Sequence, residues 1–161
     1  MQEKSQGNKK IKNATSSECG SIKFRSTLEK TVYTTLVEAG YNPVYEEKHC
    51  AIFKEFIPTI PFYTKNTFKR KNKGIHPVTN STVMDLRKVP AWVYTPDFYF
   101  EYNDYIIFIE VKGFGNDVFR YKTKLFRGLL EEMQKEDPEH RYEYWMIYSK
   151  KQLLDCLQHI R

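Results

Sequence analysis

Hydrophobic residues near the start of the chain recur at helical spacing. They fall every three to four residues: Phe24, Leu28, Val32, Leu36 and Ala39. This spacing predicts an amphipathic helix that ends at Gly40, since glycine is favoured just beyond helix termini. Two serines, Ser21 and Ser26, are candidate N-caps. The segment Ser26–Glu29 matches a capping box, in which the Glu side chain accepts a hydrogen bond from the backbone N–H of the cap residue.

From residue 41 to residue 60 the pattern becomes extended, with β-forming residues and no helical stripe. Residues 56–84 then contain no Asp or Glu, but they include five basic residues: Lys65, Lys69, Arg70, Lys71 and Lys73. An irregular stretch of this length is usually functional or disordered. We therefore predict an exposed basic loop or arm at about 61–90.

Two strands are predicted at 93–102 and 105–112, because β-forming residues dominate both segments. Asn103-Asp104 separates them as a two-residue turn, a length typical of β-hairpins. With a loop of two residues, Asp97 lies directly opposite Glu110. The second strand is apolar almost throughout, as expected for a central strand that is buried on both faces.

A second helix is predicted after Gly113, with apolar residues again at helical spacing: Val118, Tyr121, Leu125, Leu129 and Met133. Residues 142–148 are predicted to form a strand parallel to its neighbour, because a helix connects the two. A capping box at Ser149–Gln152 opens a final helix, whose inward residues are Leu153, Leu157 and Ile160. The predicted fold class is α/β, a mixed β-sheet flanked by helices.

The length of the chain allows one domain with short appendages. Its 161 residues lie within the usual size of a single domain, about 100–200 residues. Hydrophobic residues make up 40% and aromatic residues 16%, enough to build a core and to exclude a wholly disordered chain. Residues 1–20 are polar and rich in Lys, Asn and Ser, so we predict a flexible basic tail ahead of a domain spanning 21–161.

Several classes of protein do not fit the sequence. The first residues contain no apolar segment typical of a secretory signal, and the longest apolar run, 105–109, is too short to span a bilayer. Cys19, Cys50 and Cys156 form no CxxC pair, which favours reduced thiols over disulfides. We therefore expect a cytoplasmic protein with no membrane partner, located in the bacterial host cytoplasm if a phage encodes it.

The charge balance favours a polyanionic partner. Lys and Arg number 26 against 20 Asp and Glu, which gives a net charge of +6. The excess lies in the tail, in the acid-free stretch and in the helix after Gly113. On that helix the basic residues share one face, with Lys122 beside them: Arg120, Lys124 and Arg127.

The hairpin register places two carboxylates opposite each other, with a basic residue nearby. Facing side chains in an antiparallel pair lie about 4.5–5.5 Å apart at Cβ, and like charges there are destabilising. A cation between Asp97 and Glu110 would relieve that repulsion, and Mg²⁺ and Mn²⁺ favour such oxygen ligands. Lys112, two residues after Glu110, shares the same face. This set of groups suits metal-assisted phosphodiester hydrolysis.

These residues also resemble a known family. The segment Tyr94–Phe98, which contains Pro96-Asp97, and the segment Ile109–Gly113, which contains Glu110 and Lys112, are similar to the PD-(D/E)xK nuclease superfamily. Further matches at Phe24–Glu29, Gly40 and Tyr45–Glu47 resemble the phage endonuclease I-type Holliday junction resolvases. The resemblance runs from about Phe24 to Tyr148. The basic insertion between Ile57 and Trp92 is longer than that pattern.

The resemblance implies a restriction-endonuclease-like core and a set of catalytic residues. Asp97 and Glu110 would bind Mg²⁺ or Mn²⁺, one or two ions per site, with the Val111 carbonyl as a further ligand. Glu29 would serve a second metal or its water, and Lys112 would orient the attacking water. The products would carry 5′-phosphate and 3′-hydroxyl ends. The family also implies a homodimer that exchanges its first helix and strand between subunits.

The candidate DNA-binding residues combine the basic groups near this site: Arg25, Lys69, Arg70, Lys71, Lys73, Arg120, Lys122, Lys124 and Arg127. Phosphate contacts of this kind are independent of sequence. The function that we predict is a metal-dependent DNA endonuclease selective for branched DNA such as a four-way junction, an intermediate of DNA recombination.

Several alternatives remain open on the sequence alone. Glu29 could complete the capping box and have no catalytic role. Asp97, Glu110 and Lys112 could form a cross-strand surface cluster, and the basic residues could form an ordinary solvated face. The chain could instead be a duplex endonuclease of the restriction or transposition type, or a DNA-binding subunit without catalysis.

Overall fold

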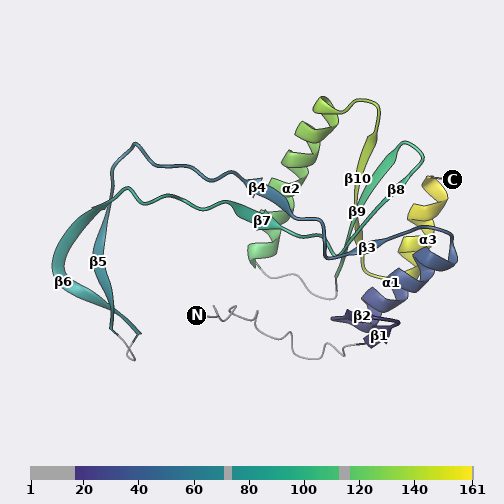
Figure 1. The fold of residues 1–161 in the computed structure, drawn as a ribbon, viewed down its shortest axis with the longest axis horizontal. Helices are drawn as coiled ribbons and strands as arrows, with labels where there is room; N and C mark the ends of the chain where they lie inside the picture. The colour runs from purple at the N-terminus through teal and green to yellow at the C-terminus, as the bar shows by residue number, and fades with distance from the viewer. Residues whose placement is uncertain (1–16, 71–73, 113–116, 161) are drawn as a thin grey trace. The chain divides into compact units, whose positions relative to one another are not determined.

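Figure 1 shows the fold in a computed structural model. The structure describes residues 17–70, 74–112 and 117–160, and for residues 65–70, 74–84 and 117 it describes the backbone alone. The chain divides into two compact units. The first comprises Met1–Cys50 and Tyr94–Arg161, and the second comprises Ala51–Val93.

The first unit is built on a four-stranded mixed sheet with the strand order β10-β9-β8-β3. Its strands are β3 (Val44–Tyr45), β8 (Phe98–Tyr102), β9 (Tyr105–Val111) and β10 (Arg141–Ile147). β8 is antiparallel to both β3 and β9, whereas β9 and β10 are parallel. The parallel pair was predicted from the helix between the two strands, and it is confirmed. The α/β class is likewise confirmed.

The β8–β9 hairpin has the register predicted from a two-residue turn at 103–104. Phe98 pairs with Ile109, so the next step outward from the turn places Asp97 opposite Glu110. Because side chains alternate between the two faces of a strand, Asp97 and Glu110 share a face of the sheet.

The predicted strand over 93–102 is wrong in its extent. The structure has two strands there, β7 (Trp92–Tyr94) and β8, separated by residues 95–97. Proline has no N–H to donate to a strand ladder, so Pro96 interrupts the strand. Asp97 therefore lies immediately before β8, where its main chain accepts from the N–H of Glu46 at 3.0 Å.

The first helix, α1 (Thr27–Glu38), begins where the capping box predicted. Ser26 is the N-cap, and its hydroxyl accepts from the N–H of Glu29 at 3.2 Å. The other half of the box differs from the prediction. The Glu29 carboxylate accepts from the N–H of Arg25, one residue ahead of the cap residue, at 3.0 Å and from the Ser26 hydroxyl at 2.9 Å.

The chain ahead of α1 forms a small hairpin. Phe24, predicted as the first residue of the helical stripe, belongs instead to β2 (Ile22–Phe24), which pairs with β1 (Ser17–Cys19). The predicted flexible tail over 1–20 is therefore wrong for residues 17–19, because Cys19 and Ile22 pack against the core. Residues 1–16 lie outside the described part of the chain.

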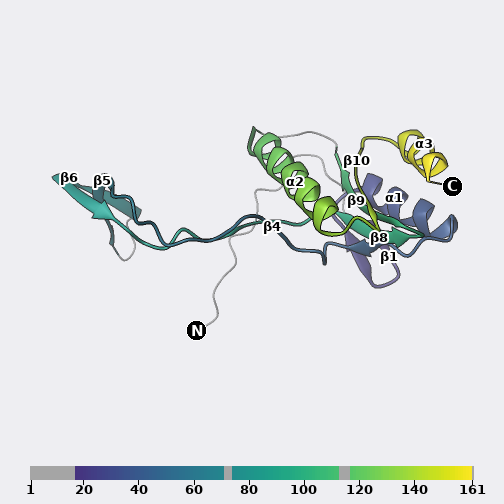
Figure 2. The same ribbon diagram turned by 90° about the horizontal axis from the view of Figure 1, so that it is seen from above.

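Helices cover both faces of the sheet. Figure 2 shows α2 (Asp117–Glu136) on one side of the strands, and α1 and α3 (Lys150–His159) on the other. The odd-numbered residues of β9 belong to the hydrophobic core that also contains buried residues of α1 and α3. Phe108, by contrast, packs against Phe126 of α2 at a ring-centroid distance of 5.3 Å. Glu110 lies two residues after Phe108 on the same strand, so its side chain also faces α2.

The apolar stripe predicted for α2 is largely wrong. Val118, Tyr121 and Leu125 are exposed, whereas Phe126 and Leu130 are buried. The helix carries apolar residues around much of its circumference, and the packing of Phe126 against Phe108 selects the face that is buried. Of the predicted stripe, Leu129 and Met133 are half-buried.

The final helix agrees with its prediction. Ser149 is the N-cap of α3, and its hydroxyl accepts from the N–H of Gln152 at 3.3 Å. The inward residues Leu153, Leu157 and Ile160 are all buried. Burying a side chain of this size contributes about 1.5–3 kcal/mol.

The second unit consists of paired strands. β5 (Phe62–Arg70) and β6 (Gly74–Asp85) form an antiparallel hairpin, and β4 (Cys50–Phe53) pairs with β7. Within the stretch predicted as an exposed basic loop or arm at about 61–90, residues 62–70 and 74–85 form these two strands rather than an irregular loop. Phe, Tyr, Thr and Val are frequent in both segments and favour strands, and this outweighs the high content of Lys and Asn.

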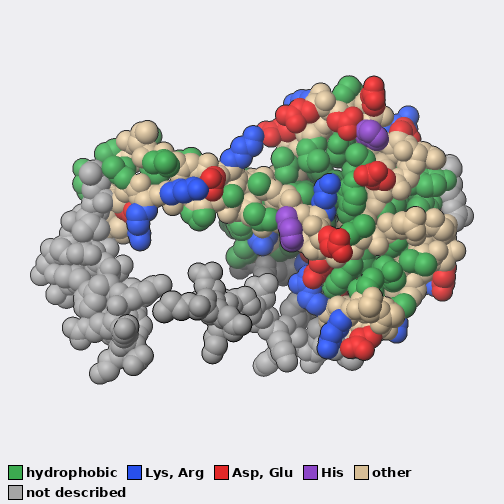
Figure 3. Space-filling model, in the orientation of Figure 1, with side chains coloured by type: hydrophobic (Ala, Val, Ile, Leu, Met, Phe, Trp, Pro, Cys, Tyr) green, Lys and Arg blue, Asp and Glu red, His purple; other side chains and the backbone are tan. Residues whose placement is uncertain are grey.

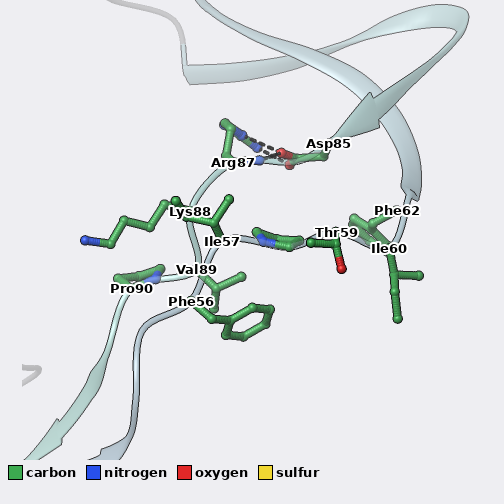
Figure 4. Close-up of a pocket in the computed structure, with 11 residues that line it drawn as sticks. Phe56, Ile57, Thr59, Ile60, Phe62, Asp85, Arg87, Lys88, Val89 and Pro90 are labelled. Atoms are coloured by element: carbon green, nitrogen blue, oxygen red, sulfur yellow. Dashed lines mark hydrogen bonds and ion pairs between the residues drawn. The ribbon is translucent and has the colours of Figure 1, made fainter.

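The second unit exposes much apolar surface. Its exposed side chains include Ile57 at 73% and Ile60 at 79%, and hydrophobic side chains cover part of the coloured surface of this unit in Figure 3. A groove of about 700 Å³ lies among residues 56–62 and 85–90, next to the Asp85–Arg87 ion pair (Figure 4). None of the predicted catalytic residues lines this groove.

Among the described residues, no helix is both long enough and apolar enough to cross a membrane. Cys19, Cys50 and Cys156 are free thiols, as predicted. Burial raises the pKa of the Cys50 and Cys156 thiols. The thiolate is the reactive form of cysteine, so this shift disfavours that form.

The hairpin turn provides a test of this fold. Asn103 has φ of 52°, a left-handed conformation that costs most L-residues about 1–2 kcal/mol but costs glycine little. We expect Asn103→Val to lower the free energy of unfolding by that amount and Asn103→Gly to leave it nearly unchanged, as measured by urea denaturation. Equal stability of the two variants would contradict this turn.

Candidate active site

Two buried carboxylates face each other at one end of the β8–β9 hairpin. Asp97 precedes β8 and is 6% exposed, and Glu110 lies near the end of β9 and is 5% exposed. Carboxylates are seldom buried to this degree unless they are paired. The contacts of these two groups therefore determine what the site can do.

The Asp97 carboxylate has two different partners. Its Oδ2 accepts from the backbone N–H of Val111 at 2.7 Å, and its Oδ1 lies 3.6 Å from Nη2 of Arg25. The Val111 N–H ties the segment before β8 to the end of β9. Arg25, just ahead of α1, supplies the positive charge.

Glu110 follows the same pattern. Its Oε2 accepts from the hydroxyl of Tyr94 at 2.5 Å, and its Oε1 lies 2.5 Å from Nζ of Lys112. Nζ of Lys112 also lies over the ring of Phe119, 4.1 Å from the centroid, a favourable cation–π position. The ammonium therefore lies between a carboxylate and an aromatic face.

Each carboxylate thus has one oxygen held by an uncharged donor and one oxygen facing a cation. The uncharged donors are the Val111 N–H and the Tyr94 hydroxyl, and the cations belong to Arg25 and Lys112. The oxygens that face the cations, Asp97 Oδ1 and Glu110 Oε1, are hard anionic ligands of the kind that Mg²⁺ and Mn²⁺ prefer. The donor chemistry therefore fits a divalent cation.

The surroundings of Asp97 disfavour its ionised form. Burial is the largest cause, followed by the neighbouring charge of Glu110, and together they raise the pKa of Asp97 to about 7, although the Val111 N–H and Arg25 act in the opposite direction. Two carboxylates that repel each other in a buried site make a cation there favourable.

Glu29 lies close enough to Asp97 for its charge to help raise the pKa of that group. Besides Arg25 and Ser26, its carboxylate accepts from the hydroxyl of Tyr45 at 2.6 Å. Burial and this hydrogen bond raise the pKa of Tyr45 to about 12, so the phenol stays a donor. Arg25, Ser26 and Tyr45 therefore hold the Glu29 carboxylate beside the helix cap, and its catalytic role stays a prediction.

Arg25 links these acidic groups. Its guanidinium pairs with Glu46 as well as with Asp97. The side chain of Arg25 remains 59% exposed, so it can also reach a bound ligand. Among the described residues, no group of three or more His, Cys, Asp or Glu side chains is arranged to hold a metal ion. A metal at this site would thus depend on Asp97 and Glu110, with main-chain and solvent oxygens.

Four residues of this site were not predicted as functional: Tyr45, Glu46, Tyr94 and Tyr144. Tyr94 and Tyr144 are joined through their hydroxyls at 2.8 Å. The sequence holds twelve tyrosines, and no spacing rule separates those that contact the acidic groups. Tyr45-Glu46 was part of the family resemblance, and that was the only available signal for these two.

The predicted DNA-binding residues fall into three groups. On α2, Arg120, Lys124 and Arg127 are exposed and Lys122 is half-buried. Lys69 and Arg70 lie on β5 of the second unit, and Lys71 and Lys73 lie outside the described residues. Arg25 contacts the acidic site through its ion pair with Asp97.

Comparison with protein-family models, with curated proteins and with solved structures finds no match. The functional argument therefore depends on the site itself.

The pKa of Asp97 predicts how stability changes with pH in the absence of metal. Its folded-state pKa lies above the unfolded value of 3.8, so the unfolded state loses this proton first as the pH rises. The contribution of Asp97 to stability therefore falls between about pH 4 and pH 7. We expect Asp97→Asn to be more thermostable than the wild type in EDTA at pH 8, with a smaller difference at pH 4.5.

Each kcal/mol gained corresponds to a rise in Tm of about 2–4 °C for a chain of this size. The matched control is Asp155→Asn, which changes an exposed aspartate on α3. A difference in Tm between wild type and Asp97→Asn that does not vary with pH would contradict this electrostatic description.

Proposed function

We propose that this chain is a metal-dependent DNA endonuclease. The observation that carries the proposal is the pairing of Asp97 with Glu110, two buried carboxylates that each turn one oxygen toward a cation. This arrangement costs folding stability when no cation is bound. Binding of a divalent cation would offset this cost, which explains why the two carboxylates are buried together.

In this proposal Asp97 and Glu110 hold the metal, with the carbonyl of Val111 as a further ligand. The bound ion would activate a water molecule and polarise the phosphate. Glu29 would act on a second metal or on the water, as the family resemblance implies. We also propose that the sheet and its flanking helices form a restriction-endonuclease-like core.

Lys112 has the most direct role among the protein groups. Its ammonium contacts Glu110 and its side chain is 20% exposed, so the ammonium can turn toward a substrate. There it would orient the attacking water and donate to the phosphate oxygens as negative charge develops. The water would lose a proton to solvent as its oxygen attacks phosphorus, and the bond to the 3′ oxygen would break as that oxygen takes up a proton from solvent, leaving a 5′-phosphate and a 3′-hydroxyl.

The basic residues would hold the DNA through its phosphates. Arg25 lies beside Asp97, and the exposed face of α2 carries Arg120, Lys124 and Arg127. Contacts with phosphates position a duplex but do not read its sequence. This fits recognition of DNA structure, and the substrate that we propose is branched DNA such as a four-way junction.

Cutting a four-way junction symmetrically requires two active sites. We therefore propose a homodimer, with the first helix and strand exchanged between subunits as in the family that the sequence resembles. A closed two-fold dimer would present two identical sites to two strands of the junction.

Incubating the purified protein with a labelled four-way junction, a fork, a linear duplex and a single strand tests the proposal. In Mg²⁺ we expect paired nicks at the branch of the junction, and in EDTA no cleavage. Asp97→Asn and Lys112→Ala should each reduce the rate by about 10²–10⁴-fold, the range of general acid–base and electrostatic contributions, without loss of folding. Equal cleavage of linear duplex would favour a restriction-type enzyme, and no cleavage of any DNA would contradict the proposal.

Glu29→Gln separates the two roles of that residue. Glutamine also serves at this position of a capping box, so α1 should keep its stability by circular dichroism. If Glu29 acts on the metal or its water, we expect cleavage to fall by at least about 10-fold. Ser26→Ala is the matched control, since it weakens the cap but leaves the carboxylate. Full activity of Glu29→Gln would reduce Glu29 to a capping residue.

A further inference from the structure

Both oxygens of Glu110 are occupied, but their two partners differ in how easily they can leave. Lys112 reaches Oε1 with a flexible side chain that is 20% exposed, whereas Tyr94, which reaches Oε2, is 4% exposed. A cation that enters the site can replace the ammonium of Lys112 at Oε1. The Tyr94 hydroxyl has no such freedom.

Aromatic packing holds Tyr94 in place. Its ring lies 4.8 Å from the centroid of Phe126, which is fully buried and also packs against Phe108 and Tyr144. The Tyr94 hydroxyl lies 2.8 Å from that of Tyr144. Moving Tyr94 away from Glu110 would disrupt this aromatic cluster.

Tyr94 must donate to Glu110, because a carboxylate can only accept. An ordinary phenol keeps its proton at neutral pH, so the Tyr94 hydroxyl acts as the donor in this bond. The Oε2 oxygen of Glu110 is therefore permanently engaged inside the protein. Only Oε1 remains for a ligand.

We propose that Tyr94 selects the metal, by restricting Glu110 to one coordinating oxygen. Mg²⁺ takes near-octahedral sets of single oxygens at 2.0–2.1 Å, whereas Ca²⁺ takes six to eight oxygens and often binds both oxygens of one carboxylate. A Glu110 that offers Oε1 alone suits Mg²⁺ or Mn²⁺ and disfavours Ca²⁺. Tyr94 is thus a positioning residue, and the inference rests on the proposed metal site.

Removing one oxygen atom tests this role. Tyr94→Phe keeps the ring and its packing but frees Oε2, so Glu110 could bind Ca²⁺ through both oxygens. Calorimetric titration of the metal-free protein with CaCl₂ and with MgCl₂ gives both dissociation constants without DNA. We expect the ratio of Ca²⁺ affinity to Mg²⁺ affinity to rise by about 10-fold, at the lower end of what partners of metal ligands contribute. A purely structural role would weaken both metals equally and leave the ratio unchanged.

Tyr99→Phe is the matched control. It removes another tyrosine–carboxylate hydrogen bond, to Glu101 on the same strand β8, and should not alter the ratio. If the wild type binds Mg²⁺ and Tyr94→Phe leaves the ratio unchanged, the inference fails and the proposed function stands. If the wild type binds no Mg²⁺, or if Asp97→Asn binds it equally well, both fail.

A measurement on the wild type covers the case in which Tyr94→Phe does not fold. The infrared carboxylate bands of a metal-bound Glu110 differ between one-oxygen and two-oxygen coordination, and subtraction of a Glu110→Gln spectrum isolates them. With Mg²⁺ we expect the wide band separation of one-oxygen binding. The narrow separation of two-oxygen binding would overturn the inference.

Discussion

The burial of two like charges opposite each other is the constraint on which the rest of this site depends. Asp97 and Glu110 meet because the β8–β9 hairpin has a two-residue turn, and both are almost inaccessible to water. Such a pair is unfavourable unless every carboxylate oxygen has a partner. The surrounding elements supply those partners, and their arrangement resembles a cation-binding site.

The partners come from separate parts of the chain. The segment before α1 supplies Arg25, β7 supplies Tyr94, and the end of β9 supplies Lys112 and the Val111 N–H. Partners that are fixed and uncharged hold one oxygen of each carboxylate, while cations on longer side chains face the other. Under the proposed function, a metal would displace these cations and leave the uncharged partners in place, so it could enter without unfolding the site.

The parts of the site that could be predicted from sequence are those set by local geometry. The hairpin register, with Asp97 opposite Glu110, followed from turn length and strand alternation. The cap at Ser26 followed from the spacing of Ser26 and Glu29. The buried face of α2 could not be predicted in this way, since its apolar residues surround much of the helix and the contact of Phe126 with Phe108 decides which of them are buried. The strand break before Asp97 was missed because β-forming residues lie on both sides of Pro96.

Sequence by itself determined the mixed α/β class, the parallel strand after α2 and the pairing of the two carboxylates. Each of these depends on interactions between residues that are near in sequence or joined by one simple connection. Only the tertiary structure decided which tyrosines hold the acidic groups and which cations face them. Tyr94 and Tyr144 are fifty positions apart, and contacts over that distance depend on how whole elements pack, which no local pattern encodes.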